Sequence, residues 1–142
     1  MDNLPLIVAP RVVLMPPTPY DLTVEHRPRY LYFRVSASLV DVEMATRYIN
    51  EMMAIIRESL HKCVLFVREI KGVMSANHVA IITSVIANLL PSDVRFAVVD
   101  SSAAFASIRR CIDREAAQKK RQMNIFQTEQ EAEAWLLSAP AE

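Results

Sequence analysis

The chain has 142 residues, and its 52% of apolar side chains are enough for one domain with a single hydrophobic core. Its 16 basic and 16 acidic side chains cancel, which excludes a whole-molecule field of the kind that draws a protein to nucleic acid or to an anionic membrane. A single glycine, Gly72, excludes phosphate-binding loops, dinucleotide fingerprints and the α/β-hydrolase nucleophile elbow, because each of these needs several glycines.

The cysteines and the apolar stretches predict a cytoplasmic protein without a membrane span. Cys63 and Cys111 are far apart, each within an apolar run, which is typical of reduced core thiols and not of a disulfide framework. The first residues lack the basic start and the uninterrupted apolar core of a secretory signal. The longest apolar stretch, at 79–90, is too short to span a bilayer.

Residues 1–19 are expected to form an extended arm ahead of a single domain at 20–142. Prolines fix the backbone of this segment and remove amide donors, so it cannot form a helix; they are Pro5, Pro10, Pro16, Pro17 and Pro19. Its two apolar runs, at 6–8 and 12–15, are expected to pack against the domain or against a neighbouring subunit.

The domain is expected to begin with a β-hairpin. Two strand-like runs, at 22–25 and 30–36, flank a turn marked by Pro28. The first long helix is predicted to start at Ser38, with Asp41 three residues later. Its buried stripe is formed by apolar residues at helical spacing, which are Ala45, Ile49, Met52, Ile56 and Leu60.

Three strand–helix units follow, which indicates a mainly parallel sheet. The first two pair a strand at 63–67 with a helix at 76–90, and a strand at 95–100 with a helix from about residue 103. In the third, a short strand ends at Phe126, and Thr128 with Glu131 has the spacing of a capping box. Trp135 shares one face of this last helix with Ala132 and Leu136, so we expect it to be a core anchor.

The helix at 76–90 is apolar around most of its circumference, so it must be covered on more than one side. Together with the apolar runs of the arm, this predicts a homodimer whose interface includes Ile82, Ile86 and Leu89. The alternative is a monomer in which the arm folds back over this helix.

The order of elements and two phrases of the sequence resemble the SpoIIAA-like branch of the STAS superfamily. The phrases are Phe-Ala-Val-Val-Asp at 96–100 and the closing Asn-Ile-Phe-Gln-Thr-Glu-Gln-Glu-Ala-Glu-Ala-Trp-Leu from Asn124, and the resemblance covers roughly 20–138. It implies a βα superhelix with a mixed, mostly parallel sheet of about five strands and about four helices, these largely on one side. It also implies a non-catalytic binding module.

In the anti-sigma-factor antagonists of that superfamily, a phosphorylatable serine follows an aspartate before the helix after the third strand. The matching position here is Ser75, but Met74 stands where the aspartate would be, so the motif is incomplete. Capping the helix at 76–90 is a sufficient role for the Ser75 hydroxyl, and we expect no essential phosphorylation there.

A local excess of basic residues on the helix from residue 103 is the other candidate site. Arg109, Arg110 and Arg114 are candidates to contact an anion or an acidic partner, although a solvated face near a helix C-terminus is the simpler explanation. Ser101 and Ser102 follow Asp100 at a strand end, where α/β proteins often bind ligands, and helix capping is the simpler role. The three histidines have no partner at metal-ligand spacing, so we expect no metal and no cofactor.

The sequence therefore predicts a regulatory or protein-interaction module of SpoIIAA-like type, with an unknown protein partner besides itself. Two alternatives stay open: a carrier of a small apolar or lipid-like ligand, and an enzyme of unknown reaction.

Overall fold

A computed structural model of the chain describes residues 20–38, 41–72 and 74–138. The predicted N-terminal arm at 1–19 lies outside these residues. Five strands form one sheet in which the strand order follows the chain, β1-β2-β3-β4-β5. They are β1 (Asp21–His26), β2 (Leu31–Ala37), β3 (Cys63–Ile70), β4 (Arg95–Val99) and β5 (Gln122–Phe126).

The sheet is mixed and mostly parallel, which confirms the predicted fold class. β1 and β2 form the expected antiparallel hairpin, and the pairs β2–β3, β3–β4 and β4–β5 are parallel. The four helices of the described residues are α2 (Val42–Glu58), α3 (Ala76–Leu89), α4 (Phe105–Lys119) and α5 (Glu129–Leu137). None of these helices is long and apolar enough to cross a membrane.

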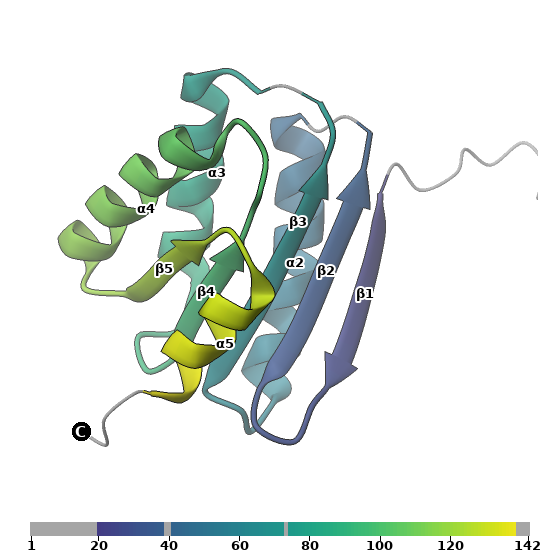
Figure 1. Cartoon of the computed structure of the whole chain (residues 1–142), viewed down its shortest axis with the longest axis vertical. Coiled ribbons are helices and arrows are strands. Elements are labelled where there is room, and N and C mark those ends of the chain that lie inside the picture. The colour runs from purple at the N-terminus through teal and green to yellow at the C-terminus, as the bar shows by residue number, and fades with distance from the viewer. Residues whose placement is uncertain (1–19, 39–40, 73, 139–142) are drawn as a thin grey trace, which may run out of the picture.

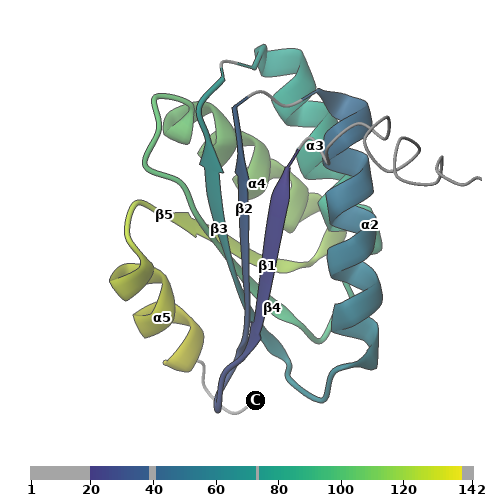
Figure 2. The ribbon, with the colours of Figure 1, turned by 90° about the vertical axis from the view of Figure 1, so that its right-hand side faces the viewer.

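Three helices cover one face of the sheet and one helix covers part of the other (Figure 1). Figure 2 shows α2, α3 and α4 on one side of the strands and α5 on the opposite side. The main core lies beneath α2, α3 and α4 and contains the aromatic series Tyr48, Phe66 and Phe96, whose neighbouring ring centroids are 6.1 and 6.0 Å apart. A smaller core lies beneath α5, around Leu65, Ala97 and Leu136.

On the α5 side, the hairpin strands are shielded by arginine side chains. The guanidinium carbon of Arg27 lies 3.8 Å from the centroid of the Tyr32 ring, and its Nη1 donates to the Tyr30 hydroxyl at 3.1 Å. That hydroxyl donates to Glu133 of α5 at 2.8 Å. Both tyrosines are buried, and the guanidinium stacked on Tyr32 covers ring surface on this side of the sheet.

Side-chain caps start three of the helices. Ser75 Oγ accepts from the amide of His78 at 3.1 Å, and Thr128 Oγ1 accepts from the amide of Glu131 at 3.2 Å. The first helix corrects the prediction, because its N-cap is Asp41, which accepts from Met44 at 2.8 Å, and not Ser38. It also ends at Glu58, so that Leu60 lies outside the helix and is 96% exposed.

Helix α3 contradicts the expected exposure of its apolar surface. Ile82 and Ile86, predicted to line a dimer interface, are each only 6% exposed because they face the sheet of their own chain. Leu89 is half-buried, and Ile81 is the exposed large apolar residue of this helix at 41%. Flanking contacts with α2 and α4 explain how one chain covers so apolar a helix.

Trp135 is half-buried and is not the fully buried anchor that the sequence predicted. Its ring lies 5.8 Å from the ring of Phe126, and the guanidinium carbon of Arg95 lies 3.8 Å from its centroid. Ala132 and Leu136 are the buried residues of α5. Because α5 is the only described helix on its face, no second helix covers the outer side of the indole.

Candidate functional site

The carboxyl ends of β2, β3 and β4 meet at one edge of the sheet, and polar side chains gather there. Because these strands are parallel, their carboxyl ends lie at the same end of the sheet. Val67 pairs with Val99, so the next residues, Arg68 and Asp100, lie side by side on neighbouring strands. We name residues 68–72, at the end of β3 and directly after it, and residues 100–104, directly after β4, the carboxyl edge.

Arg68 and Asp100 form a buried ion pair at the carboxyl edge. Nη1 of Arg68 contacts Oδ2 of Asp100, and the two side chains are 9% and 3% exposed. The hydroxyl of Tyr48, which α2 supplies, lies close to the same guanidinium. Burial raises the pKa of Tyr48 above its usual value, while the positive charge of Arg68 opposes that rise.

Asp100 also organises the loop that leads into α4. Its Oδ1 accepts from the amide and the hydroxyl of Ser102, at 2.8 and 2.6 Å. Its own amide donates to the carbonyl of Phe126 on β5 at 2.9 Å. Ser102 Oγ in turn accepts from the amide of Ala104 at 3.1 Å. Since the N-cap residue Ala104 offers no side-chain cap, Asp100 and Ser102 fix the entry to this helix.

Two adjoining hollows open at the carboxyl edge, each with a volume of about 290 Å³. They share Ile70, Lys71 and Ser102. The first extends toward the start of α3 and α4, and it is further lined by Gly72, Met74, Val79, Ala103, Ala104 and Ser107. The second extends over β2 and β3, and it is further lined by Ser36, Arg68, Glu69 and Ser101. Hydroxyl and charged groups line both hollows.

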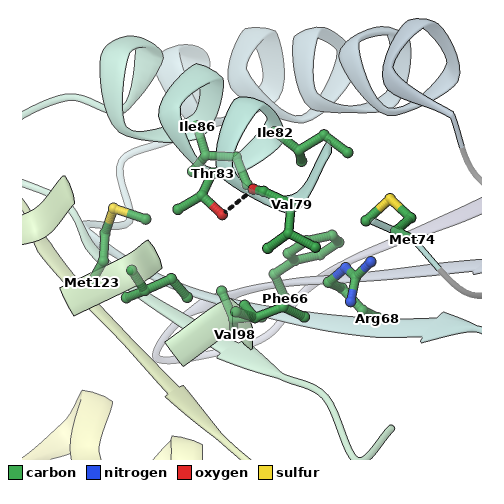
Figure 3. Close-up of a pocket in the computed structure, with 11 residues that line it drawn as sticks. Phe66, Arg68, Met74, Val79, Ile82, Thr83, Ile86, Val98 and Met123 are labelled. Carbon is green, nitrogen blue, oxygen red and sulfur yellow. Dashed lines mark hydrogen bonds between the residues drawn. The ribbon is translucent and has the colours of Figure 1, made fainter. Parts of the chain in front are cut away.

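A separate apolar cavity lies between α3, α4 and the sheet (Figure 3), and its volume is only about 20 Å³. Figure 3 shows Arg68 and Met74 at one end of it and Met123 at the other. Thr83 is buried in its wall, and its hydroxyl donates to the carbonyl of Val79 at 2.8 Å. A space of this size holds about one water molecule.

The candidate residues from the sequence occupy different places. Ser75 is exposed beside the carboxyl edge, directly after Met74, which lines one hollow. Arg109 is held elsewhere, because its Nη2 donates to the carbonyl of Ile125 at 3.0 Å. Arg110 and Arg114 are exposed on α4 and line neither hollow. The structure therefore brings Ser75, but not the three arginines, to the edge.

The sequence did not identify Arg68 as a partner of Asp100. Asp100 was visible as the acidic residue after a buried strand, and Arg68 interrupts the apolar run 63–67 in the same way. Phe66 and Val98 face the core, so the residues two positions later, Arg68 and Asp100, point to the same face of the sheet. Once β3 is placed beside β4, this alternation predicts that the two side chains meet.

The described residues contain no group of three or more His, Cys, Asp or Glu side chains that could hold a metal ion. His26, His61 and His78 lie on three separate segments.

No family model matches the chain, and no curated protein is significantly similar to it in sequence.

Proposed function

We propose that the chain is a non-catalytic regulatory module of SpoIIAA-like type, which binds a protein partner at the carboxyl edge. The observation that carries this proposal is the fixed arrangement of Arg68, Asp100 and Ser102 below two adjoining open hollows. Buried ion pairs and hydrogen-bonded loops hold a surface in one conformation, and such rigidity favours recognition because less entropy is lost on binding.

The polar groups of the edge support binding better than they support a reaction. The Asp100 carboxylate is shared between Arg68 and Ser102, and the Ser102 hydroxyl is used as a cap for Ala104. Nucleophilic catalysis needs a hydroxyl that is hydrogen-bonded to a free base. Glu69 and Lys71 line the hollows, but among the described residues neither is hydrogen-bonded to Ser101 or Ser102. The enzyme alternative gains no support from this arrangement.

The apolar cavity under α3 gives no support to the carrier alternative. The cavity under α3 has about 20 Å³, whereas pockets for small organic ligands commonly have several hundred. Binding an apolar chain there would require α3 to move away from the sheet and would expose Ile82 and Ile86.

We further propose that the module is cytoplasmic and forms a homodimer. The two cysteines are free thiols, Cys111 buried and Cys63 half-buried, which suits a reducing compartment. A dimer contact through Ile82 and Ile86, as the sequence indicated, would require the core to open, because both side chains face the sheet of their own chain.

Affinity capture with edge variants tests partner binding. Lys71→Glu and Ser101→Arg alter exposed residues that line the hollows, and Arg114→Glu is a matched charge reversal on α4, away from the edge. The tagged chain is incubated with an extract of its native host, and the retained proteins are identified by mass spectrometry. We expect one protein to be retained by the wild type and by Arg114→Glu, and lost by both edge variants. Retention by every variant, or loss with Arg114→Glu alone, would refute the carboxyl edge as the contact.

A further inference from the structure

The two outer strands of the sheet, β1 and β5, differ in whether their outward-pointing backbone amides and carbonyls have hydrogen-bond partners. At β5, the carbonyl of Phe126 accepts from the amide of Asp100, so the backbone groups of Phe126 point toward β4. Backbone groups of successive residues in a parallel strand point to opposite sides, so the amide and carbonyl of Ile125 point away from the sheet. The Ile125 amide donates to Asn124 Oδ1 at 2.8 Å, and its carbonyl accepts from Arg109 at 3.0 Å. Side chains thus occupy the outward groups of this edge at its centre.

At β1, the outward backbone groups have no such partners among the described residues. The amide of Arg27 donates to the carbonyl of Tyr30, which fixes the alternation along the hairpin. In this alternation, the amides and carbonyls of residues 21, 23 and 25 point toward β2, and those of Leu22, Val24 and His26 point away from the sheet. Figure 2 looks onto this edge, and no helix lies in front of it. The strand contains no proline, and its register is continuous, so it lacks two common protections of edge strands.

We propose that β1 pairs antiparallel with β1 of a second copy of this chain, about a two-fold axis at Val24. In this register Leu22 faces His26 of the second copy, and every outward amide and carbonyl of the strand gains a partner. The two five-stranded sheets become one continuous sheet. This inference rests on the proposed homodimer and is independent of partner binding at the carboxyl edge.

Charge selects this register over its neighbours. It places Asp21 opposite Arg27 of the second copy and Glu25 opposite Thr23, so no like charges face each other. A shift by two residues in one direction places Asp21 opposite Glu25 twice, and a shift in the other direction places Glu25 opposite Glu25. Both shifted registers also leave outward backbone groups unpaired. The strand is therefore complementary to itself in one register only.

Analytical ultracentrifugation of the full chain at micromolar to submillimolar concentration tests the pairing. We expect a species of twice 16.1 kDa. Val24→Pro removes an amide that points outward, so it should abolish the dimer and leave the hairpin bonds intact. Asp21→Arg should raise the dissociation constant about tenfold, because it places like charges opposite each other twice. Circular dichroism establishes that each variant is folded.

Each result decides the proposal. A folded Asp21→Arg variant that dimerises as tightly as the wild type would refute pairing through β1 and leave the homodimer itself standing, on another surface. A wild-type chain that stays near 16.1 kDa would refute both. A monomer that becomes a dimer on deletion of residues 1–19 would show that the chain's own N-terminal segment, and not a second copy, occupies the edge.

Discussion

The two faces of the sheet are closed by different means. The face under α2, α3 and α4 is covered by three helices and buries a continuous aromatic and aliphatic core, with the Arg68–Asp100 pair at its rim. The opposite face has one helix, α5, and over β2 the guanidinium of Arg27 takes the place that a helix would occupy. Four helices can therefore close a five-stranded sheet, because long charged side chains cover the part that no helix reaches.

Truncation in the three-helix core should give the largest effect. Phe66 has no exposed surface and contacts the aromatic rings on both sides, so Phe66→Ala should lower the free energy of unfolding by about 3–5 kcal/mol. Urea denaturation measures this, with Leu60→Ala as a control that should change the value by less than about 0.5 kcal/mol. If Phe66→Ala lowers the free energy of unfolding no more than the control does, the three-helix face does not hold the main core.

Breaking the ion pair at the rim of that core should come next. Asp100→Ala leaves a buried guanidinium without its carboxylate, and we expect a loss of about 3 kcal/mol in urea denaturation. The double variant Arg68→Met/Asp100→Leu removes the unpaired guanidinium and should recover the part of the loss that it causes, but not the part that comes from the two lost hydrogen bonds of Ser102. If the double variant is less stable than Asp100→Ala, the attraction between Arg68 and Asp100 is not the main source of the loss.

On the α5 face, removal of the indole should have a smaller effect. Trp135→Ala should cost about 1–2 kcal/mol, because the ring is half-buried and loses its contacts with Phe126 and Arg95. Gln130→Ala, at an exposed position of the same helix, is the control. A loss as large as that of Phe66→Ala would mean that α5 closes its face as tightly as three helices close theirs.

Tyr48 makes the stability of the three-helix face sensitive to alkaline pH. Its pKa is raised in the folded chain, mainly by burial, so the folded state favours the protonated phenol. This stability is fully present below the pKa of an unfolded tyrosine, near 10, and is lost as pH rises through the folded value. Between the two values the loss is about 1.4 kcal/mol per pH unit. Tyr48→Phe should flatten the fall in unfolding free energy between pH 9 and 11 relative to wild type, and identical slopes would contradict this assignment.

The smallest effect is expected at the start of α3. Ser75→Ala should cost about 1 kcal/mol, because the amide of His78 loses its acceptor. Ser75→Asp should keep the cap and the stability. Thermal unfolding of the three proteins measures both changes, and equal stability of Ser75→Ala and wild type would show that water replaces the hydroxyl without loss.

The sequence predicted most of the fold because its local signals agree with one another. The hairpin turn, the alternation of strands with helices and the caps at Ser75 and Thr128 all depend on neighbouring residues. The start of α2 was wrong because Ser38 and Asp41 are both good capping residues, and local chemistry does not choose between them. Leu60 fits the apolar period of α2 but lies beyond its end.

The candidate site was less predictable because it depends on contacts between distant segments. The period of α3 shows that Ile82 and Ile86 share an apolar face, but it does not show that α2, α4 and the sheet of the same chain cover it. The Arg68–Asp100 pair depends on the register of β3 against β4, which no local signal in the sequence defines. The sequence indicated Asp100 as the end of a strand and left its partner unidentified.

The order of the strands also bears on how the molecule assembles. Each strand pairs with the strand that precedes it in the chain, so every pairing closes a loop no longer than one helix with its connections. Short loop closures carry small entropic costs and are associated with fast folding. During synthesis from the N-terminus, the hairpin can form first and then serve as the template on which β3, β4 and β5 are added in turn. The hydrogen bond from the Asp100 amide to Phe126 belongs to the last of these additions, so the loop of the carboxyl edge becomes fixed only when the chain is almost complete.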